Sequence, residues 1–119
     1  MTPEGKIKAR VDEVLKLWKA YKHKPVQNGM GTPALDYHVG HRGYYAAIET
    51  KARGKPPTVR QIRTMREVVA AGNSVFLIDH VDGMDMSELR GWLAYPTQRS
   101  ISSTADRWLK EDNNESLDD

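Results

Sequence analysis

The chain has 119 residues, a formal net charge of +2 and no cysteine. A single domain with a full hydrophobic core is expected at this length. The lack of cysteine excludes a disulfide framework, thiolate zinc sites and a cysteine nucleophile. No apolar run reaches membrane-spanning length and the N-terminus lacks a signal-peptide pattern, so we expect a cytoplasmic protein with no membrane partner.

The positive charge is concentrated in the first half of the chain. Residues 1–60 hold 12 Lys and Arg against 5 Asp and Glu, a balance of +7, whereas residues 61–119 hold 6 against 11, a balance of −5. A basic surface suits a polyanionic partner such as nucleic acid. Basic residues on a solvated helix face are a simpler explanation of this charge. A nucleic-acid partner therefore has to be inferred from particular residues.

A first helix is predicted from Pro3 to about Lys22. Thr2 and Pro3 are typical of an N-cap followed by a first helical position. Apolar residues then recur at helical spacing and predict the buried face: Val11, Leu15 and Trp18. Glu4 lies within about 40° of this face, at its N-terminal end. Two interpretations of Glu4 stay open, a member of a polar site or an acid that favours the helix N-terminus.

Extended segments are predicted next. Residues 26–28 are a candidate short strand, and longer strands at 34–39 and 44–51 are joined by a hairpin turn at 40–43. Side chains of a strand alternate between its two faces. Glu49 and Lys51 therefore project together, from the same face as Tyr45 and Ala47.

A basic loop at 52–57 leads into a second predicted helix, which begins at the N-cap Thr58, reaches about Ala71 and places Gln61 near its start. Residues 74–79 are mostly apolar, as expected of a strand covered on both faces. Residues 87–95 are a candidate short helix. The order αβββαβ predicts an α/β fold, with a small mixed sheet flanked by helices.

We take residues 1–96 as one domain and residues 97–119 as a polar C-terminal extension. Residues 111–119 contain five acids and no base, so this tip is expected to be disordered. Trp108 and Leu109 are expected to dock either onto the body of the protein or onto a partner.

The strongest chemical pattern is Asp36 followed, thirteen residues later, by Glu49-Thr50-Lys51 at the end of an apolar strand. Charged groups in such a place are costly to bury unless something compensates them. A divalent ion held by Asp36 and Glu49 compensates the acids, with the backbone carbonyl of Thr50 completing the protein ligands, and hard oxygen ligands suit Mg²⁺. This combination indicates metal-assisted hydrolysis of a phosphodiester.

The neighbouring residues fit supporting roles in such a reaction. Lys51 is expected to neutralise charge on the phosphate or to lower the pKa of the attacking water. Gln61 is expected to orient that water or Lys51. Glu4 is expected to add an outer ligand or a ligand of a second ion.

These residues, in their order along the chain, resemble the motif set of the PD-(D/E)xK nuclease superfamily. Within it they resemble the VRR-NUC branch, especially the small stand-alone members encoded by bacteriophages. The similarity covers about residues 2–80, and Pro33 departs from the usual pattern because two residues separate it from Asp36. The matching segments are residues 2–6, 25–29, 31–36, 41–43, 47–51 and 58–61.

The resemblance implies a restriction-endonuclease-like core and a DNA endonuclease that depends on Mg²⁺ or Mn²⁺. It also implies a homodimer, activity on branched DNA such as Holliday junctions and, for a phage-encoded member, the host cytoplasm. We expect DNA contacts from Arg42, Arg53, Lys55 and Arg60, although a solvated loop remains an equal explanation for Arg53 and Lys55. The alternative from another class is a non-catalytic nucleic-acid-binding module on the same fold.

Overall fold

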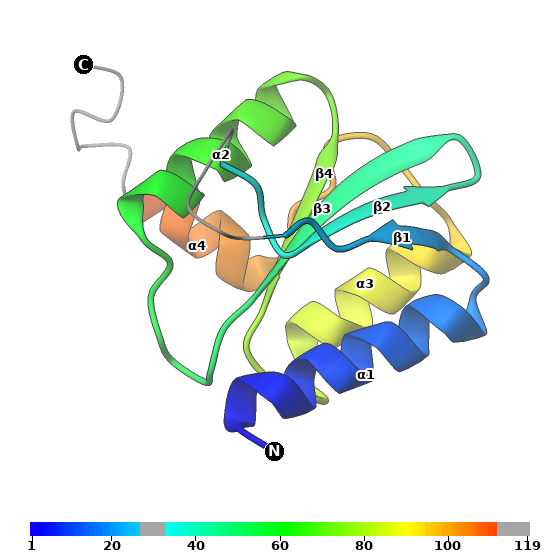
Figure 1. Cartoon of the computed structure of the whole chain (residues 1–119). Helices are drawn as coiled ribbons and strands as arrows, with labels where there is room; N and C mark the ends of the chain where they lie inside the picture. Colours follow the sequence, from blue (N-terminus) through cyan, green and yellow to red (C-terminus); the bar gives the residue numbers. More distant parts are fainter. Residues whose placement is uncertain (27–32, 112–119) are drawn as a thin grey trace.

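The computed structural model describes residues 1–26 and 33–111, without the side chain of residue 111. Figure 1 shows helices on both sides of one small sheet. The elements in chain order are α1 (Pro3–Leu17), β1 (Tyr21–His23), β2 (Tyr37–His41), β3 (Tyr44–Thr50), α2 (Val59–Ala70), β4 (Ser74–Ile78), α3 (Met84–Ala94) and α4 (Ser103–Glu111).

The four strands lie in the order β1-β2-β3-β4. β1 and β2 pair antiparallel, as do β2 and β3, whereas β3 and β4 run parallel. The connection between the parallel strands is the helix α2, which is the crossover that parallel pairing requires. The predicted small mixed sheet flanked by helices is confirmed.

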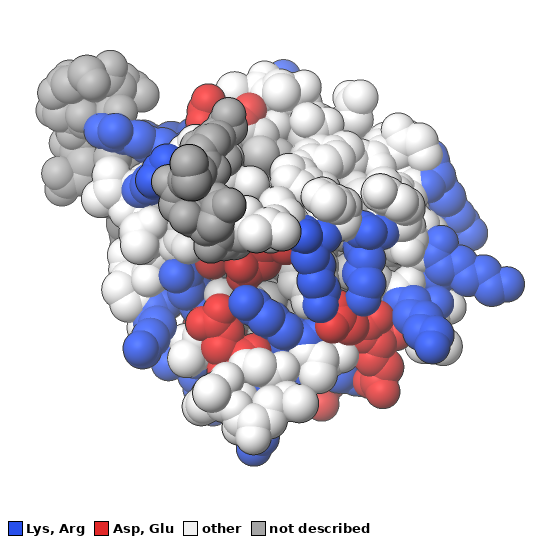
Figure 2. Space-filling view, in the orientation of Figure 1, with Lys and Arg blue, Asp and Glu red and all other residues white. Residues whose placement is uncertain are grey.

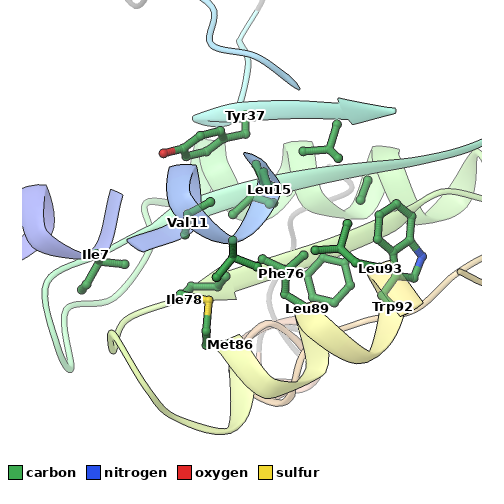
Figure 3. Packing of buried hydrophobic residues seen from close by; sticks show 14 residues of the cluster. Ile7, Val11, Leu15, Tyr37, Phe76, Ile78, Met86, Leu89, Trp92 and Leu93 are labelled. Atoms are coloured by element: carbon green, nitrogen blue, oxygen red, sulfur yellow. The ribbon is translucent and has the colours of Figure 1, made fainter. Parts of the chain in front are cut away.

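Two hydrophobic clusters fill the space between the sheet and its helices. α1 and α3 pack on one face of the sheet against alternate residues of the strands, among them Ile48 of β3 and Phe76 of β4. Figure 3 shows this cluster, in which Leu15 and Trp92 belong to the two helices. α2 and α4 pack on the other face, against a second cluster that includes Ala47. Burial of each large side chain contributes about 1.5–3 kcal/mol.

α1 ends at Leu17, and the predicted end near Lys22 is wrong. Lys19 takes a left-handed conformation with φ 58°. Its N–H donates to the carbonyl of Lys16, and the next N–H, of Ala20, donates to the carbonyl of Leu15. This pair of hydrogen bonds is a Schellman cap, which usually has glycine at the left-handed position. Because lysine occupies it here, the sequence carries no stop signal.

The chain then returns along the sheet as β1, a strand that the sequence analysis did not predict. Lys22 and Lys24 both donate to the carboxylate of Asp12 on α1, at 2.8 and 2.7 Å. The hydroxyl of Tyr37 donates to the same carboxylate at 2.9 Å. These contacts hold β1 between α1 and β2.

In the candidate strand at 26–28, the first residue lies outside any strand and the other two lie outside the described residues.

β2 begins at Tyr37, three residues later than predicted, so Asp36 precedes the strand. The hairpin turn is also tighter than expected, because it consists of Arg42 and Gly43 alone. Both residues have positive φ, 53° and 85°. This is the pattern of a two-residue type I′ turn, whose twist matches that of the strands.

The carboxyl ends of β3 and β4 meet at one edge of the sheet, because the two strands are parallel. Thr50 pairs with Ile78 there, and the N–H of Lys51 donates to the carbonyl of Ile78 at 3.1 Å. All five residues of β4 are buried, which confirms the prediction of a strand covered on both faces. Glu49, Thr50 and Lys51 therefore lie at this edge of the sheet.

The packed fold continues beyond residue 96 into α4, a helix that the sequence analysis did not predict. The N–H of Val75 donates to the carbonyl of Ser100, and the N–H of Ser102 donates back to the carbonyl of Val75. The segment therefore runs beside β4 before the helix begins. Trp108 and Leu109 pack against the second cluster, so they dock onto the body of the protein. The predicted disordered tip lies almost wholly outside the described residues.

α3 begins at Met84, three residues before the predicted start. Its residue Asp85 accepts hydrogen bonds from the backbone N–H and the hydroxyl of Thr104, which joins the beginnings of α3 and α4. None of the helices in the described parts of the chain is both long enough and apolar enough to cross a bilayer.

Candidate active site

Among the acids that the structure describes, Glu49 has the most strongly shifted pKa. It lies at the end of β3 and only 3% of its surface is exposed. Its carboxylate accepts a hydrogen bond from the side-chain amide of Gln61 at 3.0 Å. The pKa of Glu49 is raised to about 8, mainly by burial and then by the charge of Asp36, while Lys51 acts in the opposite direction. The charge of this carboxylate is therefore incompletely compensated.

Gln61 connects this carboxylate to the beginning of α2. The side-chain oxygen of Gln61 accepts a hydrogen bond from the backbone N–H of Thr58 at 2.9 Å. The backbone N–H of Gln61 in turn donates a hydrogen bond to the hydroxyl of Thr58. This is a capping box, which satisfies two donors of the first helical turn. The side-chain NH₂ of Gln61 points to Glu49. The side-chain amide of Gln61 thus positions the acid itself, and the role of orienting Lys51 or a water stays a prediction.

Asp36 lies next to Glu49, just before β2 begins. Its Oδ2 accepts two hydrogen bonds from Thr50, from the backbone N–H at 2.9 Å and from the hydroxyl at 2.8 Å. Its Oδ1 faces the ammonium of Lys8 on α1, at 3.8 Å. The carboxylate is therefore fixed through one oxygen, and the other oxygen is directed toward a cation.

Lys51 follows β3 on the face predicted for it. Its ammonium lies 3.7 Å from Oε2 of Glu49, and its side chain is 16% exposed. Tyr45 and Ala47 belong to the second cluster, between the sheet and α2, and Glu49 reaches α2 through Gln61. The predicted common face of these alternate residues is confirmed.

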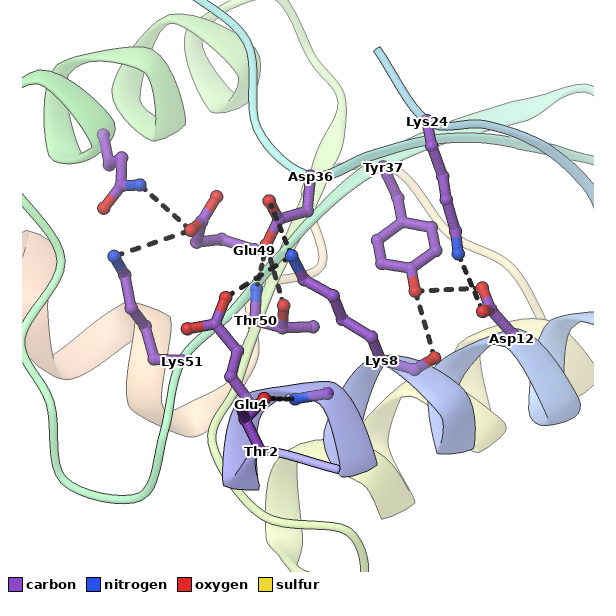
Figure 4. A network of polar contacts seen from close by, with 12 residues as sticks. Thr2, Glu4, Lys8, Asp12, Lys24, Asp36, Tyr37, Glu49, Thr50 and Lys51 are labelled. Atoms are coloured by element: carbon purple, nitrogen blue, oxygen red, sulfur yellow. Dashed lines mark hydrogen bonds and ion pairs between the residues drawn. The ribbon is translucent and has the colours of Figure 1, made fainter. Parts of the chain in front are cut away.

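Glu4 approaches the site from the N-terminal turn of α1. Its carboxylate lies 3.5 Å from the ammonium of Lys8, which also faces Asp36 (Figure 4). Glu4 is thus linked to the site through a lysine, and 38% of its side chain is exposed. Sequence reasoning missed Lys8, although its i, i+4 spacing from Glu4 is a recognisable pairing signal.

Comparison with known proteins agrees with this architecture. No family model matches the sequence, and no curated protein matches it significantly. One solved structure described as "VRR_NUC domain" superposes on this chain with a TM-score of 0.63 and 20% sequence identity. The superposition covers 80% of this chain and 98% of that one. The chain has the fold of a VRR_NUC domain.

The VRR_NUC fold confirms the fold class and, at the level of architecture, the resemblance predicted from the sequence. At this level of identity the similarity concerns the fold alone. The chemistry of the site therefore depends on the residues of this chain, which the fold brings to one edge of the sheet.

Basic residues surround this edge. Arg53 and Lys55 lie in the exposed loop after β3, and Arg60 lies in the exposed first turn of α2. None of the three forms an ion pair with any residue of the described ranges. Figure 2 shows acidic side chains on this face with Lys and Arg side chains around them. Three of the four predicted DNA contacts thus lie on the segment that joins Lys51 to Gln61.

Arg42 is placed at the other end of the sheet. It lies in the turn before β3, and the seven residues of that strand span about 20 Å. Its guanidinium donates to the carbonyl of Ala94, the last residue of α3, at 3.2 Å. A cation is favourable at the carboxyl end of a helix. The structure therefore gives Arg42 a structural contact and does not bring it to the site.

The carboxylates at this edge of the sheet offer ligands to a divalent ion. In the described parts of the chain no three His, Asp or Glu side chains gather closely enough to hold a metal. Two carboxylates are present, however, and Mg²⁺ is commonly held by one or two carboxylates together with waters and substrate phosphates. The incompletely compensated charge of Glu49 and the cation-facing Oδ1 of Asp36 fit such an ion.

Proposed function

We propose that this protein is a metal-dependent endonuclease that hydrolyses phosphodiester bonds of DNA. The observation that carries the proposal is the buried carboxylate of Glu49, whose pKa is raised to about 8 beside a second carboxylate and a lysine. A strongly perturbed acid with specific charged neighbours is typical of a functional site. A purely structural acid would be expected to have its charge compensated within the fold.

The acids supply the ligands. We propose that Oδ1 of Asp36, the carboxylate of Glu49 and the backbone carbonyl of Thr50 hold Mg²⁺ or Mn²⁺. When bound, such an ion lowers the pKa of a coordinated water and polarises the phosphate. Thr50 fixes Asp36 through two hydrogen bonds and Gln61 fixes Glu49 through one, so both carboxylates are oriented before an ion arrives.

Lys51 supplies positive charge to the reaction. Its ammonium is largely buried and lies within 4 Å of Glu49, so it is positioned with little freedom. We propose that it neutralises the charge that develops on the phosphate in the transition state. Fixed charge in a partly water-excluded site stabilises a transition state more than the same charge in water.

The exposed bases beside the site suit the DNA backbone. We propose that Arg53, Lys55 and Arg60 contact phosphates on either side of the bond that is cleaved. Such contacts position a duplex without reading its sequence. Three such phosphate contacts predict that the affinity for DNA falls as the salt concentration is raised.

Selectivity for branched DNA, the homodimer and the host cytoplasm are proposed on the family resemblance alone. A two-fold homodimer suits a four-way junction, because the junction presents paired phosphates to paired sites. Linear duplex, flap, single-stranded and four-way-junction DNA should therefore be compared as substrates. A symmetric pair of nicks on the junction is the expected result.

The activity itself is tested by incubating the wild type, Asp36→Asn and Lys51→Ala with these DNAs, with and without Mg²⁺ or Mn²⁺. We expect cleavage by the wild type only with metal, and none by either variant, while both variants remain folded by circular dichroism. Cleavage that survives both substitutions would refute the proposed site. Salt-sensitive DNA binding with no metal requirement and no cleavage would identify the non-catalytic binding module instead.

A further inference from the structure

Lys8 occupies the space between two acids of the candidate site. Its ammonium lies 3.5 Å from Oε2 of Glu4 and 3.8 Å from Oδ1 of Asp36. Figure 4 shows the side chain reaching from α1 toward both carboxylates. Both acids were predicted as metal ligands from the sequence, so a monovalent cation lies where a divalent one is expected.

The two oxygens of Asp36 have different tasks. Oδ2 is engaged by the backbone and the hydroxyl of Thr50. Oδ1 is the oxygen that faces Lys8, and within the described residues that ammonium is its only ion-pair partner. A divalent ion bound by Asp36 would use the same oxygen. Lys8 and the ion therefore compete for one acceptor.

We propose that Lys8 holds the place of the divalent ion in the metal-free protein, and that it turns to a phosphate of the bound DNA when the ion binds. This inference rests on the proposed function. The like charges of an ammonium and a divalent ion repel each other strongly when both face one oxygen. Binding of the ion thus disfavours the position that Lys8 has in this structure.

The side chain of Lys8 is able to make this change. It is 40% exposed, and lysine carries its charge on a flexible stem with three rotatable donors. Lys51, by contrast, is only 16% exposed. The released ammonium would remain close to Asp36, and a phosphate is the anion that the proposed substrate offers at this site.

The proposal predicts effects of opposite sign when Lys8 is replaced. Lys8→Met keeps an apolar stem of similar length and removes the charge. Affinity for Mn²⁺ should rise about tenfold, because a competing positive charge a few ångströms away is lost. Affinity for DNA in the presence of Mn²⁺ should fall, with the salt dependence reduced by about one phosphate contact. Without metal, DNA affinity should change little, because Lys8 is then engaged by Glu4 and Asp36.

Isothermal titration with Mn²⁺ measures the first effect, and fluorescence anisotropy with a labelled duplex measures the second. The anisotropy titrations use a Lys51→Ala background, so that the DNA is not cleaved. Lys6→Met is the matched control, because Lys6 is an exposed lysine of the same helix and forms no ion pair with the described residues. Lys8→Arg, which keeps the charge, should retain wild-type affinity for Mn²⁺.

A purely structural role of Lys8 would have a different signature. Lys8→Met would then lose affinity for both Mn²⁺ and DNA, along with stability in urea, and the proposal would be overturned. If Lys8→Met binds Mn²⁺ with the affinity of the wild type, and Asp36→Asn still weakens that binding, only the proposed role of Lys8 is overturned. If the wild type and Asp36→Asn bind Mn²⁺ equally weakly, the metal site fails, and the proposed function and this inference fail with it.

Discussion

Asp12 and Glu49 are two acids of the same sheet-and-helix body with opposite electrostatic environments. Burial raises the pKa of Asp12, but hydrogen bonds from Lys22, Lys24 and Tyr37 outweigh burial, and the net pKa is lowered. Glu49 is buried more deeply, beside a second carboxylate, and its pKa is raised to about 8. The fold supplies Asp12 with hydrogen bonds from two lysines, whereas it supplies Glu49 with a single lysine at 3.7 Å.

The difference separates an acid that stabilises the fold from one that is prepared for a ligand. The contacts of Asp12 join α1 to β1 and β2, so its charge serves the packing of those elements. Glu49 receives a hydrogen bond from the side-chain amide of Gln61 and one from the backbone of Asp36, with Lys51 at 3.7 Å, but burial outweighs them and its charge stays incompletely balanced. Burying a charge without compensation lowers the stability of the fold. A binding site tolerates this loss when a bound ligand later neutralises the charge.

The largest effect expected from this comparison is on catalysis. Glu49→Gln removes the charge that the divalent ion needs, so the cleavage rate should fall about 10³-fold or more, as when a main electrostatic group is lost. Initial rates of nicking in Mg²⁺ measure the effect. Glu67→Gln, on the exposed side of α2, is the control and should cleave normally. A loss below tenfold would contradict the role of Glu49.

The second effect is on the pH dependence of stability without metal. Between its ordinary pKa of 4.5 and about 8, folded Glu49 keeps a proton that the unfolded chain has released. The free energy of unfolding should therefore fall as the pH rises from about 5 to 8, by roughly 2–4 kcal/mol. Urea titrations in a chelator measure it, and Glu49→Gln should remove this slope. Parallel curves for the two proteins would refute the raised pKa.

A third, smaller effect is expected on the structural side of the comparison. Asp12→Asn weakens charge-assisted hydrogen bonds to two lysines, and the free energy of unfolding should fall by about 1–2 kcal/mol. The cleavage rate should stay within about twofold of the wild type. Asp106→Asn, which removes an exposed pair with Lys110, is the control and should cost less than about 0.5 kcal/mol. Equal losses for the two variants would show that Asp12 has no special role.

The smallest effect contrasts the two ends of β3. Arg53→Ala and Lys55→Ala should each weaken DNA binding a few-fold and lower the salt dependence by about one contact. Arg42→Ala should change DNA affinity by less than twofold, because its guanidinium contacts the end of α3. Anisotropy titrations at several salt concentrations distinguish them. A larger effect for Arg42 would restore it as a DNA contact.

The parts of the fold that sequence reasoning predicted are those whose signals are local. The apolar run of β4 and the N-cap Thr58 belong to short stretches of sequence, and both are where we expected them. β1 has three residues with exposed ends, and it depends on distant Asp12. α4 depends on packing against β4 and α2. β1 carries no comparable local signal, whereas Ala105, Trp108 and Leu109 recur at helical spacing along α4, a signal that the sequence analysis did not use.

The candidate site shows the same division. Alternation along β3 was sufficient to place Glu49 and Lys51 together on one face. The bond between Thr50 and Asp36 joins two segments of the hairpin and follows from their register, which the sequence leaves open. Arg42 lies far from the site because it precedes β3, whereas Glu49 lies at the end of that strand. The expected hairpin turn already contained Arg42, but its assignment as a DNA contact neglected the length of the strand.

Gln61 also limits which amino acid can occupy its position. One side chain accepts a hydrogen bond that begins a helix and donates another that steadies a carboxylate. Glutamate at position 61 would keep the acceptor oxygen but would place a third acid beside Asp36 and Glu49. Asparagine has both groups, but its side chain is one carbon too short to reach both partners. Glutamine alone offers both an oxygen and an NH₂ at that reach, so a laboratory selection for activity at this codon should return the original residue.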